Sequence, residues 1–195
     1  MNVAPSPARP TAKGRATVRR VAIVGLATLL VTGTAYAAWP GFALVPHHIR
    51  SRPAATLSAA LSREAAAELD GAATPEAAIE AAVRVTGRHL HFGLGHRRSG
   101  SFDVAEREAH CVEYAHLTGA LVARWSRTHG GALRVEVVRS QARLFGARVP
   151  MRGWADHDWV LVEGGGRRWY VDPTFADMGL GWDLRRNVEG LDARR

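Results

Sequence analysis

The feature that most constrains the fold of this 195-residue chain is an uncharged, largely apolar run, Val21–Ala38, which directly follows two arginines. A run of 18 such residues behind a basic pair is typical of a signal peptide or a signal anchor whose basic end stays in the cytoplasm. Residues 35–37 (Ala-Tyr-Ala) suit cleavage, whereas the length is close to the minimum for crossing a bilayer and the long preceding tail favours retention. Either outcome places the rest of the chain outside the cytoplasm, membrane-anchored or secreted.

The positive charge of the chain lies before its first acidic residue, Glu64. The net charge is +8, and eight basic residues precede Glu64. From Glu64 onward, 18 basic and 18 acidic residues balance. A basic tail ahead of an apolar segment fits membrane targeting better than a DNA-binding surface. We therefore predict a membrane contact through the N-terminal segment and no nucleic-acid partner.

Three further regions flank the apolar run. Residues 1–20 are rich in Pro and Ala and have no apolar period, so we expect a disordered basic tail. Residues 39–73 are expected to hold a linker, Pro40–Pro53, and an alanine-rich helix, Ala54–Asp70. Residues 74–195 are long enough for one domain with its own core.

The only cysteine, Cys111, stands at the start of a strongly apolar helical pattern, His110–Trp125. This pattern has almost no polar face, so we expect the helix to form the buried centre of the domain. A short strand, Leu133–Val138, and a loop, Ser140–Arg152, are expected to follow it. One cysteine excludes an intramolecular disulfide, and most free cysteines are small buried apolar residues. Cys111 therefore becomes a catalytic candidate only if suitable partners lie beside it.

A β-hairpin is predicted downstream, with strands over 157–163 and 166–172 joined by two glycines as a two-residue turn. Counting outward from this turn places His157 directly opposite Asp172. Cross-strand neighbours have Cβ atoms about 4.5–5.5 Å apart, which is within hydrogen-bond reach for these two side chains.

Together, Cys111, His157 and Asp172 would supply a nucleophile, a base and a group that orients the base. A cysteine reacts as the thiolate, and its pKa falls at a helix N-terminus and beside an imidazolium. His157 would pair with the thiolate and then protonate the leaving group, while Asp172 would hold the imidazole and stabilise its cation. The backbone N–H of Cys111 is the expected oxyanion donor.

The sequence around these residues resembles the transglutaminase-like superfamily of papain-like thiol enzymes. The resemblance covers roughly Thr74–Asp177: Cys111 opens an apolar helix, an H-x-W-V sequence begins at His157, and a W-x-V-D-P-T sequence contains Asp172. It implies an α+β fold with a papain-like or transglutaminase-like core, in which a buried helix bearing the cysteine packs against an antiparallel sheet bearing the His and the Asp. It also implies a Cys–His–Asp catalytic triad.

The chain departs from the family's pattern just before the nucleophile. Family members often carry Gly or a Gly-x pair there, where this chain has Ala109-His110, and no glutamine stands one turn upstream. The second oxyanion donor is therefore left open, with a Trp indole as one candidate type.

Three aromatic residues near the candidate triad are predicted to contact a substrate, namely Trp154, Trp159 and Tyr114. His110 and His116 lie near Cys111 in sequence, but their spacing matches no strong zinc motif. We therefore expect no metal site and no cofactor.

Three functions remain open at this stage. The preferred one is a cysteine peptidase or amidase that acts on protein or peptidoglycan-type amides outside the cytoplasm. The second is a protein acyltransferase of the cross-linking transglutaminase type, because the same triad can pass an acyl group to an amine. The third is a catalytically inactive, membrane-anchored interaction domain. The first two require a protein or peptide substrate as partner.

Overall fold

The computed structural model describes residues 39–50, 53, 55, 57–93, 108–149 and 155–190. The elements, in order, are η1 (Trp39–Gly41), β1 (Phe42–Arg50), α2 (Ala59–Leu69), α3 (Pro75–His89), β2 (His91–Phe92), β3 (Glu108–Ala109), α4 (Cys111–Thr128), β4 (Arg134–Leu144), β5 (Ala147–Arg148), β6 (Asp156–Gly164), β7 (Arg167–Val171) and α5 (Pro173–Asp177). The elements from β1 onward lie in a compact unit that spans Gly41–Arg195. It mixes helices with an antiparallel sheet, which is the α+β class expected from the sequence.

The tail and the apolar run predicted over residues 1–38 lie outside the described residues. Among the helices that are described, none combines the length and the apolar character needed to cross a bilayer.

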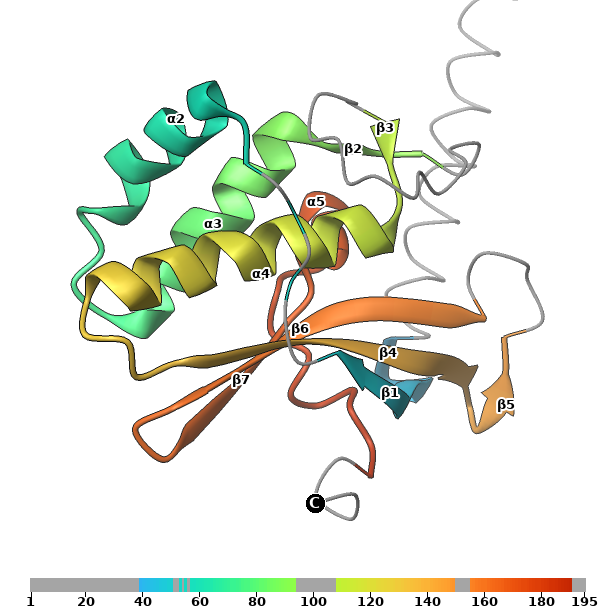
Figure 1. The fold of residues 1–195 in the computed structure, drawn as a ribbon. Helices are drawn as coiled ribbons and strands as arrows, with labels where there is room; N and C mark the ends of the chain where they lie inside the picture. Colours follow the sequence, from blue (N-terminus) through green and yellow to red (C-terminus); the bar gives the residue numbers. More distant parts are fainter. Residues whose placement is uncertain are drawn as a thin grey trace, which may run out of the picture. The chain divides into compact units, whose positions relative to one another are not determined.

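The main sheet has the strand order β1-β4-β6-β7, with β5 paired to the end of β4. All of its strand pairs are antiparallel, whereas β2 and β3 form a separate parallel pair. Helices α2, α3 and α4 lie on one side of the main sheet (Figure 1). Alternate residues of the central strands face them, so that Val137, Val160 and Val171 join the buried cluster with the apolar side of α4. As expected, α4 forms the centre of the domain.

The linker predicted over Pro40–Pro53 is largely a strand. β1 pairs with β4 along its whole length, and the compact unit therefore begins near Gly41 instead of near Thr74. The sequence concealed this strand because Pro46 interrupts it. The register shifts at Pro46, and β1 is the edge of the sheet, which is where proline is tolerated in a strand.

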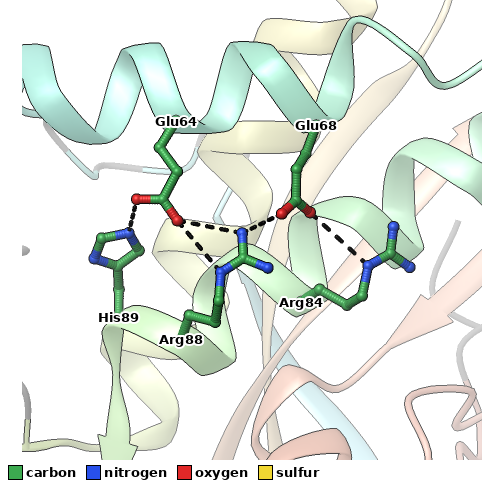
Figure 2. A network of polar contacts seen from close by, with 5 residues as sticks. All are labelled: Glu64, Glu68, Arg84, Arg88 and His89. Carbon is green, nitrogen blue, oxygen red and sulfur yellow. Dashed lines mark hydrogen bonds and ion pairs between the residues drawn. The ribbon is translucent and has the colours of Figure 1, made fainter.

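The helix predicted over Ala54–Asp70 begins later, at Ala59. Ser58 is its N-cap, and its side chain accepts a hydrogen bond from the N–H of Leu61 (3.2 Å). Helix α2 packs on α3 through Leu61, Ala65 and other apolar residues of the core. Figure 2 shows a network of charged side chains that connects the exposed sides of the same two helices. Helix α2 therefore belongs to the domain.

The prediction of a loop over Ser140–Arg152 is also wrong for the first half of that range. The strand expected to end at Val138 continues to Leu144, because β4 lies between β1 and β6 and pairs with both. A strand with neighbours on both edges has its backbone hydrogen bonds satisfied there. This pairing stabilises the strand although its second half is polar and has only a weak apolar–polar alternation. Residues 150–152 lie outside the described residues.

The hairpin of β6 and β7 has a register different from the predicted one. Gly164 faces Arg167, so the turn consists of Gly165 and Gly166, both with positive φ. Moving the turn by one residue places Trp159 opposite Asp172, and His157 then lies diagonal to that aspartate. The parity of the register is unchanged, so both side chains remain on one face of the sheet.

Candidate active site

Cys111 is the first residue of the 18-residue helix α4. The preceding residue, His110, is the N-cap, and its backbone N–H donates to the Glu113 carboxylate (3.0 Å). This return contact from the third helical position fixes the start of the helix, as in a capping box. The thiol consequently lies where the helix dipole and the first amide N–H groups favour negative charge.

Tyr114 braces the first turn of α4 against two other elements. Its hydroxyl oxygen lies 2.7 Å from the carbonyl oxygen of Leu90, at the end of α3, and 2.7 Å from the carboxylate of Asp177, in α5. The side chain is fully buried. Tyr114 was predicted to contact substrate, but in this position it connects α4 to the helix that follows Asp172.

His157 and Asp172 form a buried pair despite their diagonal register. The Nε2 atom of His157 contacts the Oδ2 atom of Asp172. The other carboxylate oxygen, Oδ1, accepts hydrogen bonds from the N–H groups of Thr174 (2.9 Å) and Phe175 (3.0 Å), because Asp172 is the N-cap of α5. The ring of Phe175 stacks on His157 with a centroid distance of 4.8 Å and an interplanar angle of 11°. The start of α5 thus fixes both members of the pair.

The thiol of Cys111 completes this arrangement. The His157 side chain and the backbone of Asp158 lie close enough to the sulfur to lower its pKa, and the Sγ atom lies 4.0 Å from Nδ1 of His110. Because Nε2 of His157 faces Asp172, the Nδ1 atom is the one left for the thiol. The structure therefore brings the three predicted residues together in the order thiol, imidazole and carboxylate.

The electrostatics of the site favour the ion pair of thiolate and imidazolium. Burial raises the pKa of the Cys111 thiol, but hydrogen bonds from His110 and His157 and the charge of His157 outweigh this effect and lower the pKa to about 6. Burial has the opposite effect on His157 and lowers its pKa, because it disfavours the cation. The charge of Asp172 and its hydrogen bond outweigh this effect and hold the pKa of His157 well above the ordinary value. A lowered thiol pKa beside a raised histidine pKa favours the thiolate over the thiol at neutral pH.

Arg139 is a member of this environment that the sequence analysis missed. Its guanidinium donates two hydrogen bonds to the Asp158 carboxylate, from Nε (2.7 Å) and Nη2 (3.0 Å). Asp158 is almost fully buried, and its backbone is one of the groups that lower the pKa of the thiol. The hydrogen bond to Asp158 raises the pKa of Arg139 further, and the negative charges of Asp158 and Cys111 act in the same direction. Extending the predicted strand by one residue would have placed Arg139 opposite Asp158.

The other two aromatic residues predicted to contact substrate have different outcomes. Trp159 has no exposed surface, and its indole N–H donates to the Ser140 hydroxyl (2.8 Å). This position offers a substrate neither contact area nor a free oxyanion donor. Trp154 lies outside the described residues.

Access to the thiol is narrow in the part of the chain that the structure describes. Cys111 is 2% exposed and His157 is 6% exposed. A cavity of about 750 Å³ lies elsewhere, beside the second half of α4, where it is lined by residues such as Leu57, Ala120 and Arg124. None of the three candidate catalytic residues lines this cavity.

The described residues contain no group of three or more His, Cys, Asp or Glu side chains arranged to hold a metal ion. His110 lies against the thiol, whereas His116 is buried further along α4.

No family model, no curated protein and no solved structure matches this chain.

Proposed function

We propose that this protein is a cysteine acyl-transfer enzyme of the transglutaminase-like, papain-like kind that cleaves amide bonds outside the cytoplasm. The observation that carries the proposal is the buried contact between His157 and Asp172, placed beside a thiol whose pKa is lowered to about 6. The order of the elements supports it as well, because the cysteine opens a central helix and the His and Asp follow on adjacent antiparallel strands.

The reaction would proceed in two steps. The Cys111 thiolate attacks the carbonyl carbon of an amide, and the His157 imidazolium gives its proton to the departing amine as the C–N bond breaks. The acyl group is then bound to sulfur as a thioester. Water, deprotonated by the imidazole, attacks this thioester and releases a carboxylic acid. Asp172 keeps the ring oriented and stabilises its cationic form throughout.

Hydrolysis is the preferred outcome, and transfer to an amine is the alternative. The two differ only in the nucleophile that attacks the thioester, so the triad serves both. Incubation with activated esters of short peptides, with and without an added primary amine, separates them by product. A free acid indicates a peptidase or amidase, and an amide of the added amine indicates an acyltransferase.

The proposal is tested by trapping the acyl-enzyme. Intact-mass spectrometry of the full chain after incubation with the same esters is expected to detect one acyl group, located at Cys111 and absent from Cys111→Ala. If the chain forms no adduct with any ester over the pH range 5–9, the proposal that it is a cysteine enzyme is refuted.

One observation favours a second candidate, an inactive interaction domain. The thiol and the imidazole are nearly inaccessible within the described residues. In that case the triad would survive as a buried ionic network, and Cys111 would react with neither esters nor small alkylating agents in the folded chain.

A further inference from the structure

The tip of the hairpin formed by β4 and β5 presents a large apolar side chain to solvent. Phe145 is 74% exposed and, with a φ of 49°, is the only residue other than glycine with positive φ in the described part of the chain. Bulky residues adopt this conformation rarely, because their Cβ atom meets the backbone. The preceding residue, Leu144, is 38% exposed. The ring of Phe145 lies against Gly41, where a Cβ atom would meet it, but most of its surface faces solvent, so the two side chains form an exposed apolar point at a tight turn.

Two arginines flank this point. Arg143 and Arg148 lie directly opposite each other in the register of β4 and β5. Like charges in this position repel each other, so the arrangement disfavours the hairpin in isolation. Arg143 contacts the neutral side chain of Gln141 (3.4 Å), and neither arginine pairs with a carboxylate among the described residues. The two charges are therefore available to an anionic partner.

The chain enters the domain beside the same tip. The N–H of Phe145 donates to the carbonyl oxygen of Gly41 (2.7 Å), and Phe42 faces Leu144 in the sheet. Gly41 follows Ala38, the end of the apolar run, by three residues, which span at most about 10 Å even when fully extended. If the run stays in a bilayer, the hairpin tip cannot lie far from the lipid headgroups.

We propose that the hairpin tip, made of Phe145 and Leu144 between Arg143 and Arg148, is a membrane-contact surface that binds the anionic headgroup layer next to the retained anchor. The aromatic ring enters the interface, where aromatic side chains are favoured, and the two guanidinium groups bind lipid phosphates. This inference rests on the extracytoplasmic location of the proposed function and on retention of Val21–Ala38 as an anchor, and it does not depend on catalysis by Cys111.

The contact would also set the distance between the candidate active site and the membrane surface. His157 faces Ser140, which precedes Phe145 by five residues, or about 17 Å of strand. A tip held at the headgroups therefore keeps the thiol within a short distance of the membrane surface, where amides of membrane-proximal proteins are within reach.

The test uses the full chain with Cys111→Ala, so that an introduced cysteine is the only one. Phe145→Cys and, as the matched control, Glu80→Cys at an exposed position of α3 are labelled with the same environment-sensitive fluorophore. Each protein is inserted into vesicles that contain phosphatidylglycerol and a lipid with a quencher near the headgroup. We expect quenching at position 145 to exceed that at position 80 several-fold. Reversing both flanking charges, Arg143→Glu with Arg148→Glu, should remove most of this difference.

Two results would overturn the inference. One is equal quenching at the two positions in a chain that floats with the vesicles. The other is a full chain that does not float with vesicles at all, because the anchor is then not retained. Neither result depends on the thiol, so a failure of the catalytic proposal is recognised separately, by alkylation of the unmodified Cys111.

Discussion

Two groups of charged side chains in this protein combine the same kinds of residue in opposite surroundings. Between α2 and α3, Glu64 lies 2.8 Å from His89 and 3.2 Å from Arg88, and these side chains are 29–46% exposed (Figure 2). Beside α4, His157 contacts Asp172, and these side chains are 8% and 0% exposed. Each group contains a His–carboxylate contact, and the difference between them is access to water.

The comparison indicates why only one of the two is a candidate site. Hydrogen bonding to His89 lowers the pKa of Glu64, but solvent screens the exposed network and limits its effect on stability. The buried pair is screened much less, and the hydrogen bond and charge of His157 are among the causes that lower the pKa of the thiol beside it. The same kind of contact belongs to an exposed, screened network in one place and lies beside a buried thiol with a lowered pKa in the other.

The largest expected effect is that of removing the nucleophile. Cys111→Ala should abolish the acyl adduct and all turnover, because no other cysteine is present. The free energy of unfolding should change by no more than about 1–2 kcal/mol, since one small buried group is lost. Intact-mass spectrometry and urea unfolding measure the two quantities. Turnover that persists in this variant would eliminate the mechanism.

The next largest effect concerns the orienting carboxylate. Asp172→Asn should lower turnover by a factor on the order of 10³–10⁴, because the imidazolium loses its counter-charge. The fold should be kept, since the Asn carbonyl can still accept from the N–H groups of Thr174 and Phe175. Asp172→Ala should also lose the helix cap, at about 1 kcal/mol of stability. Near-normal turnover in the Asn variant would mean that the buried pair is structural.

The next prediction concerns Arg139, which supports the buried group through its hydrogen bonds to Asp158. Arg139→Gln leaves the buried Asp158 without its partner, so we expect the free energy of unfolding to fall by about 3–5 kcal/mol. It should also slow alkylation of Cys111 near pH 6, because a positive charge that favours the thiolate is gone. Arg139→Gln with Asp158→Asn, in which neither charge is left unpaired, should recover most of the stability. An unaltered pH profile of alkylation in both variants would show that Arg139 acts on the fold alone.

The smallest effect is expected in the exposed network. Glu64→Gln should change the free energy of unfolding by less than about 1 kcal/mol, as is usual for exposed ion pairs. Alkylation of Cys111 should be unaffected at every pH. A larger loss of stability would mean that ion pairs contribute substantially to the packing of α2 on α3. The exposed network would then differ less from the buried pair of His157 and Asp172.

The proximity of Cys111, His157 and Asp172 could be predicted, because residue type and chain order restrict which side chains can meet. The register could not be predicted, since three successive glycines allow the turn at either of two places, and the structure has it at Gly165 and Gly166. The prediction that His157 and Asp172 lie on the same face of the sheet still holds, because moving the turn by one residue preserves the parity of the register.

Other parts of the structure depend on long-range contacts that the sequence does not display. Pro46 hid β1, which is stabilised by pairing with a strand almost 100 residues away along the chain. Trp159 looked like a candidate for substrate contact from its place beside His157, but strand alternation and the hydroxyl of Ser140 place it in the core. Arg139 was missed because its strand was ended one residue too early.

The most direct test of the central proposal is the pH dependence of Cys111 alkylation in the full chain, measured beside His157→Ala. The lowered pKa predicts a rate that rises with pH, has its midpoint near pH 6 and is already close to its plateau at pH 7. In His157→Ala, the midpoint should move toward the ordinary cysteine value of about 8.5, so the rate at pH 7 should fall. A wild-type midpoint in the ordinary range, or a profile that His157→Ala leaves unchanged, would contradict an activated thiol and leave Cys111 as a buried structural residue.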